Sequence, residues 1–243
     1  MVIGIKNEVI ANDINTKTVF VFDWDGTIFD SMSAKLKSFS AVVSKYFTEL
    51  GNPVDSDFVA AIYREHSGKP RSEIFLEAAK AAVMQLGQLE IDEMSKRLFL
   101  LNQTVLAEAN IFPDAHRLLS VLADRDVGLF ISSSVPQAEL DYFVSVALPE
   151  NLRSRFSGVF GSREGCSKGR EHIAHISACS GILSDKILVI GDDEADFILS
   201  KAADVACILV DRDSRWFDRY SPNVVKNLDE LCNLLNPTVS TRS

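Results

Sequence analysis

Two aspartates separated by one residue follow an apolar segment near the start of the chain. Asp23 and Asp25 come directly after residues 18–22. In an extended chain, carboxylates at this spacing project to the same side and repel each other, unless one is protonated or a cation binds both. Gly26 permits a sharp turn and a close approach of its amide to a ligand. The segment predicts a metal or phosphoryl site, and the structural alternative is an acidic turn after a strand.

A second acidic cluster follows another apolar segment. After residues 187–190 the chain reads Gly-Asp-Asp-Glu-Ala-Asp, which brings Asp192, Asp193 and Asp196 together in sequence. So many carboxylates at the end of a buried strand require a cation or full solvation. Oxygen ligands of this kind suit Mg²⁺. Capping of a following helix is the alternative explanation for one of the three aspartates.

Hydroxyl groups and a lysine complete the set of candidate phosphate ligands. Ser132, Ser133 and Ser134 end the apolar segment 128–131. Hydroxyls and amides at such a position bind phosphoryl oxygens, while capping of the next helix explains Ser134. For Ser132 the binding and structural interpretations are equally open. Lys168 lies at a predicted helix start, where the helix dipole disfavours a cation, so a functional role competes with that of an ordinary surface lysine.

Apolar and amphipathic segments alternate along the chain, which is typical of an α/β fold with a parallel sheet. The predicted strands cover residues 18–22, 127–132, 158–160, 186–190 and 205–210, and the predicted helices between them cover 113–124, 136–147, 169–180 and 194–203. In a doubly wound sheet the first strand is central and the fourth lies beside it at the switch point. Asp23 and Asp192 are therefore predicted to converge on one metal ion.

The stretch from residue 31 to residue 110 interrupts this alternation with helical periodicity. A connection within an α/β unit is normally about 2–6 residues long, so the stretch predicts a second domain. Its predicted helices cover residues 33–50, 56–66, 72–86 and 91–109. We therefore expect a Rossmann-like doubly wound core of residues 1–30 and 111–243, with residues 31–110 as an α-helical cap over the ligand crevice. Residues 1–17 give no prediction.

Charge and composition limit the partners of the protein. The net charge of −9 disfavours nucleic acids and anionic membranes, whose binding depends on clustered lysine and arginine. It does not disfavour a small phosphorylated metabolite, because local cations and a metal outweigh the global field. No apolar run reaches the roughly 18–20 residues of a membrane span, and no signal-peptide pattern is found, so we expect a cytoplasmic protein. The four cysteines lack metal-site spacing, and the oligomeric state is left open.

These four segments, in this order, resemble the haloacid dehalogenase superfamily of phosphatases and phosphomutases. Residues 23–27, with the continuation 28–31, are similar to its DxDGT signature, and residues 191–196 are similar to its GDxxxD signature. The helical insert after the first motif is similar to that of phosphoglycolate phosphatase and β-phosphoglucomutase. The third motif departs from the family, because Lys168 precedes glycine rather than proline. The segment 112–114 also departs, because the family often has glycine there.

The resemblance implies a role for each matching residue. Asp23 would be the nucleophile that forms an aspartyl-phosphate, and Asp25 would protonate the leaving oxygen and then deprotonate the attacking water. Ser132 would donate a hydrogen bond to the transferring phosphoryl group. Lys168 would neutralise charge on that group and orient Asp23.

The same resemblance implies a magnesium site. Asp192 would bind Mg²⁺ together with the carboxylate of Asp23 and the backbone carbonyl of Asp25. Asp196 would support the site, and Asp193 is a possible further partner.

Substrate specificity is expected to depend on further residues. Thr27 and Ser133 are candidates for substrate binding beside the first two motifs. Residues 65–71 resemble the specificity loop of the family's cap, where Lys69 and Arg71 would contact an anionic group, although a solvated basic turn explains them equally well. His66 is expected to pack or face water rather than to catalyse, and His116, His172 and His175 are expected to be helix-face residues.

Three functions fit this sequence. The leading hypothesis is a Mg²⁺-dependent phosphatase that hydrolyses a small phosphomonoester. A phosphomutase of the β-phosphoglucomutase type would use the same motifs. The third alternative is a non-catalytic protein that binds phosphate or regulates a partner, since a fold alone does not establish an activity.

Overall fold

The computed structural model describes residues 2–66, 68–220 and 223–235. The chain divides into two compact units, one formed by Met1–Phe29 with Ile111–Ser243 and the other by Asp30–Asn110. We call the first the core unit and the second the helical unit, and each is described by itself. The helical unit begins one residue before the predicted insert.

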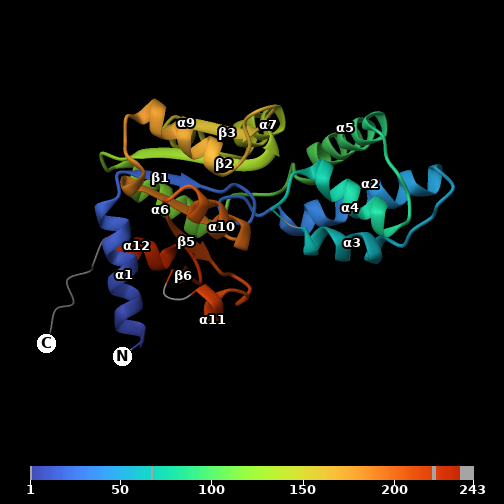
Figure 1. Ribbon diagram of the computed structural model, residues 1–243. Helices are drawn as coiled ribbons and strands as arrows, with labels where there is room; N and C mark the ends of the chain where they lie inside the picture. The colour runs from blue at the N-terminus through green and yellow to red at the C-terminus, as the bar shows by residue number, and fades with distance from the viewer. Residues whose placement is uncertain (1, 67, 221–222, 236–243) are drawn as a thin grey trace, which may run out of the picture. The chain divides into compact units, whose positions relative to one another are not determined.

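The core unit contains a six-stranded parallel sheet in the order β3-β2-β1-β4-β5-β6 (Figure 1). The strands are β1 Val19–Phe22, β2 Gly128–Pro136, β3 Phe156–Ser162, β4 Ile187–Gly191, β5 Ala206–Val210 and β6 Val224–Val225. The predicted doubly wound sheet is thereby confirmed. Five strands lie where apolar segments predicted them, whereas β6 has only two residues and too short a pattern to be recognised.

The register of the central strand explains why two distant motifs meet. Phe22, the last residue of β1, pairs with Ile131 of β2 on one side and Ile190 of β4 on the other. The amide of Asp23 continues this ladder by donating to the carbonyl of Ile190 at 2.8 Å. Because parallel strands end at the same edge of a sheet, the residues that follow β1 and β4 emerge side by side, at the switch point of the topology.

Helices pack on the sheet and on one another. The core helices are α1 Val2–Thr16, α6 Pro113–Ala123, α7 Gln137–Ala147, α8 Glu150–Arg153, α9 Arg170–Ser180, α10 Glu194–Ala202, α11 Phe217–Tyr220 and α12 Asp229–Leu235, with a 3-10 turn at Ser184–Lys186. Ile173 and Ile176 of α9 pack against Val21 and Val189 in one buried apolar cluster. This face of the sheet therefore fixes α9, and with it the segment just before the helix.

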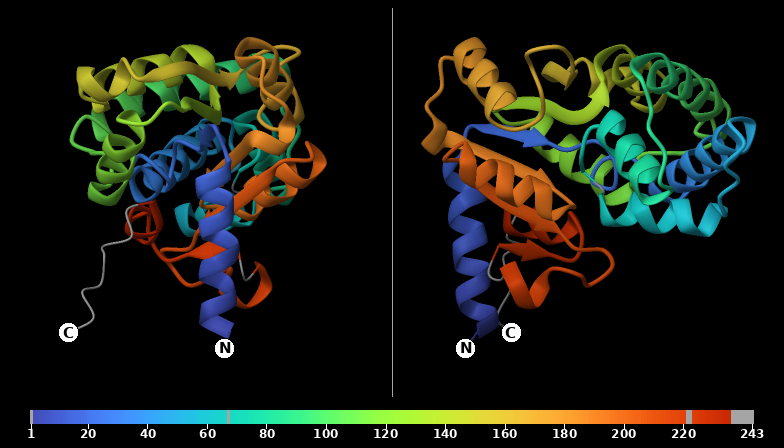
Figure 2. Two further views of the ribbon diagram at one scale, coloured as in Figure 1. Left: turned by 90° about the vertical axis from the view of Figure 1, so that its left-hand side faces the viewer. Right: turned by 45° about the vertical axis from the view of Figure 1, so that its right-hand side comes forward.

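The first helix was not predicted from the sequence. Ile10 and Ile14 of α1 are buried, and the helix packs against α12 (Figures 1 and 2). The side chain of Asn15 donates to the carbonyl of Leu234. Among the side chains of residues 8–16, whose burial is described, only Ile10 and Ile14 are buried, which makes a weak periodic signal. Contact with α12 stabilises the helix further.

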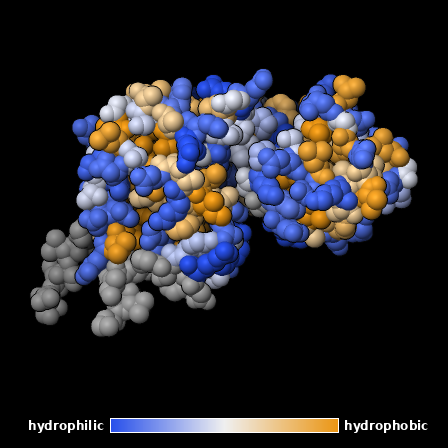
Figure 3. Space-filling model, viewed as in Figure 1, coloured by the Kyte–Doolittle hydropathy of each residue, from blue (hydrophilic) through white to orange (hydrophobic). Residues whose placement is uncertain are grey.

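The helical unit has its own apolar core, formed by α2 Met32–Glu49, α3 Ser56–Glu65, α4 Arg71–Ala81 and α5 Gln88–Val105. Phe39 and Phe75 stack with ring centroids 5.1 Å apart. The predicted helix 72–86 ends early because Val83 adopts a left-handed conformation, with φ of 56°. Some large apolar side chains remain exposed, including Val83 and Leu89, and Figure 3 shows apolar residues on the viewed face of this unit.

No helix among the described residues has the length and apolar character to cross a membrane.

Candidate active site

Three carboxylates meet at the edge of the sheet where β1 and β4 end. Oxygen atoms of Asp23, Asp192 and Asp196 lie within 4.8 Å of one another, and all three residues are buried. Asp23 follows β1, Asp192 follows β4, and Asp196 lies in the first turn of α10. The structure thus brings together two aspartates that are far apart in sequence and were predicted to converge.

Lys168 bridges two of these carboxylates. Its Nζ lies 2.8 Å from Oδ1 of Asp23 and 2.7 Å from Oδ1 of Asp196. Burial opposes the charge on this amine, but the carboxylates of Asp196 and Asp23 outweigh burial and raise the pKa of Lys168. The lysine is therefore held as a cation within the acidic cluster. The same pocket is lined by Ser132.

One amine does not neutralise three buried carboxylates. Burial raises the pKa of Asp23 to about 7, with Lys168 acting against it and Asp196 and Asp25 acting with it. Burial, followed by the charges of Asp23 and Asp196, also raises the pKa of Asp192 well above its usual value. Such a site accommodates either protons or a cation. A set of closely spaced carboxylate oxygens fits a hard divalent cation such as Mg²⁺.

Gly26 makes the approach of the two acidic segments possible. Its φ is +77°, and a Cβ atom built at this residue would lie 2.2 Å from Oδ2 of Asp192. Only glycine combines this backbone conformation with such a close contact. The turn after Asp25 therefore packs directly against the acidic segment that follows β4.

Gly169 explains the departure of the third motif from Lys-Pro. It precedes α9 with φ of 113°, which proline cannot adopt because its ring holds φ near −65°. A Cβ atom there would also lie 2.9 Å from Cδ2 of Leu199. Ser167 does not cap α9, since its amide and hydroxyl donate to the side chain of Glu171. The unusual conformation of Gly169 directs Lys168 into the acidic cluster.

The aspartates that follow β4 have different roles. Asp193 is the N-cap of α10 and accepts a hydrogen bond from the amide of Ala195 at 2.9 Å. Oδ2 of Asp196 accepts from the amide of Asp193 at 3.3 Å, while Oδ1 faces Lys168. Capping therefore accounts for Asp193, as the sequence allowed for one aspartate. Asp196 connects the helix start to the lysine.

The serines within β2 have different surroundings. Ser132 is buried, and its Oγ lies 2.8 Å from Nδ1 of His172. The hydroxyl of Ser133 accepts from the amide of Val135 at 3.2 Å, which is a local turn contact. The predicted capping by Ser134 was wrong, because β2 continues to Pro136, which is the N-cap of α7.

His172 is the residue near the site that sequence reasoning missed. It lies on α9, as a helix-face residue was expected to, but it is fully buried and in contact with Ser132. The available signal was its position in the first turn of the helix that directly follows Lys168. His175, by contrast, is exposed and packs edge-on against Phe160 at 5.1 Å between ring centroids.

The loop between β1 and the helical unit is stabilised by its own side chains, which pack inside it. Trp24 is fully buried and stacks on Phe29, with ring centroids 5.1 Å apart. Asp25 is half-buried and pairs with Phe29 through an isolated bridge. Thr27 is fully buried, and no hydrogen-bond partner of its hydroxyl is found among the described residues. The loop therefore presents Asp25 at the sheet edge and keeps Trp24 and Thr27 inside.

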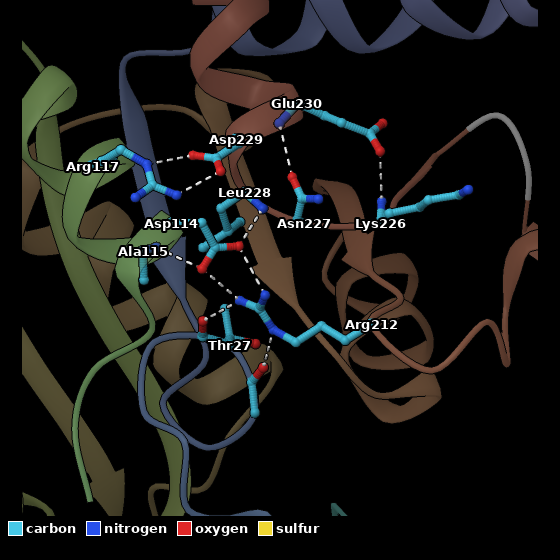
Figure 4. Close-up of polar contacts among 11 residues, drawn as sticks. Thr27, Asp114, Ala115, Arg117, Arg212, Lys226, Asn227, Leu228, Asp229 and Glu230 are labelled. Atoms are coloured by element: carbon cyan, nitrogen blue, oxygen red, sulfur yellow. Dashed lines mark hydrogen bonds and ion pairs between the residues drawn. The ribbon is translucent and has the colours of Figure 1, made fainter.

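An arginine after β5 holds this loop by its backbone. Arg212 donates to the carbonyls of Gly26 and Thr27 at 3.3 and 3.4 Å, and to both carboxylate oxygens of Asp114 (Figure 4). Its guanidinium lies 3.8 Å from the ring centroid of Phe112. Asp114 also accepts from the amide of Leu228 at 2.8 Å. Sequence reasoning missed this contact, although Arg212 follows a predicted strand at the same sheet edge.

The next residues of that segment contact the acidic cluster directly. Nε1 of Trp216 donates to the backbone carbonyl of Asp192 at 2.9 Å, and a guanidinium nitrogen of Arg215 lies 3.7 Å from Oδ2 of the same residue. The amides of Arg215 and Trp216 donate to the buried carboxylate of Asp211. Trp216 also packs against the apolar core, and it thereby holds the main chain of Asp192 in place.

The two predicted specificity residues lie in the helical unit. Nζ of Lys69 is 3.1 Å from Nδ1 of His66, and Arg71 is the first residue of α4. Residue 67, in the same predicted loop, lies outside the described residues.

Comparisons with known proteins agree with this geometry. The family model for haloacid dehalogenase-like hydrolases matches residues 20–210. A curated relative, the enolase-phosphatase E1 of Persephonella marina, is 24% identical over 129 residues, which are 52% of this chain and 57% of the relative. The match thus spans just over half the length of that relative.

Solved structures share the whole fold. A protein assigned as a phosphoglycolate phosphatase from Lactobacillus plantarum has a TM-score of 0.69 at 15% identity, with 90% of this chain and 99% of that chain covered. A protein assigned as a β-phosphoglucomutase from Thermotoga maritima has a TM-score of 0.63 at 17% identity, with 91% and 99% covered. These are the two kinds of protein that the motifs and the helical insert indicate. Because the family model spans most of its length, the chain belongs to the haloacid dehalogenase-like hydrolase family.

Proposed function

We propose that this hydrolase is a Mg²⁺-dependent phosphatase that cleaves a small phosphomonoester through an aspartyl-phosphate on Asp23. The observation that carries the proposal is the bridge from Lys168 to Asp23 and Asp196, beside the buried carboxylate of Asp192. The ammonium group of Lys168 orients one carboxylate oxygen of Asp23 and leaves the other oxygen to attack phosphorus. Catalysis of phosphoryl transfer consists mainly of such positioning and of charge compensation in the transition state.

Two displacements account for hydrolysis. In the first, an oxygen of Asp23 bonds to phosphorus, the ester P–O bond breaks, and Asp25 gives its proton to the leaving oxygen. In the second, water attacks the same phosphorus, the bond to Asp23 breaks, and Asp25 takes the proton from the water. Ser132 and Lys168 hold the phosphoryl oxygens throughout, and Ser133 is a further candidate for their binding. The half-buried position of Asp25 suits a group that exchanges a proton with ligand and water.

The acidic cluster would hold the metal. Asp23 and Asp192 would supply carboxylate oxygens and Asp25 its carbonyl, while Asp196 and Asp193 support the site through Lys168 and the start of α10. Bound Mg²⁺ lowers the repulsion between an anionic nucleophile and an anionic phosphate. The contact from Trp216 to the carbonyl of Asp192 keeps this ligand in place before any cation binds.

The substrate class follows from charge and from relatives. We expect a small phosphorylated metabolite, with the helical unit serving as a cap in which Lys69 and Arg71 contact a second anionic group. The names of the Persephonella marina and Lactobacillus plantarum proteins support a phosphatase. The name of the Thermotoga maritima protein supports a phosphomutase as the second candidate. A sugar bisphosphate intermediate, trapped during turnover, distinguishes the mutase from the phosphatase.

The test is hydrolysis of an aryl phosphate with and without Mg²⁺, by wild type and by Asp23→Asn. We expect turnover only with Mg²⁺ and a loss of at least about 10³-fold in the variant, since its amide is a poor nucleophile. Asp124→Asn is the matched control, because Asp124 is exposed at the end of α6. Activity of Asp23→Asn at the level of this control would refute the mechanism.

A further inference from the structure

An imidazole occupies a position where the neighbouring residues of the same helix face are apolar. His172 is 0% exposed, and Ile173 and Ile176 of α9 pack beside it into the core. Its Nδ1 lies 2.8 Å from Oγ of Ser132, which lines the same pocket as Asp23 and Lys168. Burying a polar ring is unfavourable unless the ring makes a hydrogen bond, so this one contact requires an explanation.

The ring is neutral in its surroundings. The pKa of His172 is lowered to about 4, chiefly because the ring is buried and in part because Lys168 is positively charged, while the backbone of Gly161 and Cys166 and the charge of Glu171 only partly oppose this. A neutral imidazole carries one proton, on either Nδ1 or Nε2. The position of the imidazole proton determines whether the Ser132 hydroxyl donates its own proton to His172 or to another group.

The second ring nitrogen indicates which tautomer is present. Nε2 of His172 is buried, and no described residue, the carbonyls of Gly161 and Cys166 included, lies at hydrogen-bonding distance and angle from it. A buried N–H without an acceptor costs more than a buried lone pair without a donor, so the proton is better placed on Nδ1. Nδ1–H then donates to Oγ of Ser132. The opposite tautomer would take the proton of Ser132 and leave only lone pairs facing an anionic ligand.

We propose that His172 is a positioning residue, whose Nδ1–H donates to Ser132 and thereby directs the serine hydroxyl proton toward a phosphoryl oxygen. The inference rests on the proposed function, in which Ser132 binds the transferring group. It adds a residue outside the recognised motifs, in the first turn of the helix that follows Lys168. His172 itself touches no substrate and acts only through Ser132.

The first experiment compares two variants of this residue with a control. His172→Leu removes the donor, while His172→Asn keeps an amide near the position of Nδ1. We expect His172→Leu to lower kcat/KM for an aryl phosphate about tenfold and to weaken inhibition by inorganic phosphate similarly, and His172→Asn to restore most of both. His175→Leu, on the same helix but exposed, should change neither more than twofold. Equal losses in the Leu and Asn variants would overturn the proposal.

A double-mutant cycle separates positioning from support of the fold. If His172 acts through Ser132, then adding His172→Leu to Ser132→Ala lowers activity no further. A full additional tenfold loss in the double variant would contradict the proposal. Urea unfolding of all variants, run alongside, measures the separate loss of stability.

The tautomer is measured without any turnover. In uniformly ¹⁵N-labelled, metal-free protein, the ring nitrogen shifts of His172 are assigned by comparison with His172→Asn. We expect a protonated Nδ1 and an unprotonated Nε2, and the reverse pattern would overturn the inference. Failure of the proposed function has a different signature, because wild type would then be as inactive as Asp23→Asn while the tautomer stays measurable.

Discussion

Gly26 determines how closely the two acidic segments approach each other. Its φ of +77° is shared by other turn glycines, such as Gly165 with φ of +68°, but their surroundings differ. A Cβ atom at Gly26 would overlap the carboxylate of Asp192, whereas one at Gly165 would meet no atom within 4 Å. Substitutions at the two glycines therefore distinguish two effects. At Gly165 a side chain causes backbone strain alone, whereas at Gly26 it also displaces the carboxylate of Asp192.

Alanine at each of these glycines should have different effects on activity. We expect Gly165→Ala to lower the free energy of unfolding by about 1–2 kcal/mol through its left-handed conformation and to leave kcat unchanged. Gly26→Ala should carry a similar strain and also lower kcat/KM for an aryl phosphate by at least about 100-fold, because Asp192 must move. Steady-state kinetics at saturating Mg²⁺ and urea unfolding measure the two effects. Equal kinetics in both variants would show that the close contact has no role in the site.

Residue types alone identify the main side chains of the site but not the contacts that hold them in place. The carboxylates, Ser132 and Lys168 could be named from the sequence because their types and their places after apolar strands point to phosphate chemistry. The roles of His172 and Arg212 depend on contacts across the fold, 40 and 186 residues along the chain from Ser132 and Gly26 respectively. No periodic pattern encodes such contacts, so a structure is required to find them.

At the scale of elements, the strands were predictable and some helix ends were not. Buried parallel strands read as continuous apolar runs, which is why β1, β4 and β5 were recognised with small errors in their bounds. The apolar run of β2 was recognised too, but the strand continues through its serines to Pro136. Helix starts depend on single backbone conformations, and the φ of Gly169 moved the start of α9 by one residue. The helix α1 and the strand β6 form through contacts with α12 and β5, which local sequence does not specify.

The link between β5, α6 and the Asp25 loop is an ionic one. Hydrogen bonds from Arg212, Leu228 and Ala115 lower the pKa of Asp114, although burial alone would raise it. The carboxylate therefore contributes stability at pH values above its ordinary pKa of 3.8, and this contribution is lost as the pH falls through the lowered pKa of the folded state. Figure 4 shows a second pair nearby, between Arg117 and Asp229, whose side chains are 54% and 42% exposed.

Asparagine at the two aspartates should separate a buried ion pair from an exposed one. We expect Asp114→Asn to lower the free energy of unfolding by about 2–3 kcal/mol at pH 7, since Arg212 loses its partner in a partly buried position. Asp229→Asn should cost less than about 1 kcal/mol. Urea unfolding from pH 7 down to pH 3 should show the deficit of Asp114→Asn shrinking as the wild-type carboxylate is protonated. A deficit that stays constant over this range would refute the electrostatic account.

The whole molecule consists of two units with separate apolar cores. The core of the helical unit is built around Phe39, Phe75 and Met94, and the candidate metal site lies entirely within the core unit. A cation that binds only the folded core unit stabilises it by mass action, by about 2.7 kcal/mol at a concentration 100 times its Kd. The two units therefore provide an internal comparison for metal binding.

Mg²⁺ should protect one unit from hydrogen exchange and not the other. We expect saturating Mg²⁺ to slow amide exchange in β1 and β4, with no change in α2 and α5, if the helical unit opens separately from the core unit. The effect should disappear in Asp192→Asn, because one of the buried carboxylates becomes a neutral amide. Fluorescence of Trp216, whose Nε1 donates to the carbonyl of Asp192, gives an independent titration of the same site. Equal protection of both units by Mg²⁺ would show that they unfold as one cooperative body, and protection retained in Asp192→Asn would place the cation elsewhere.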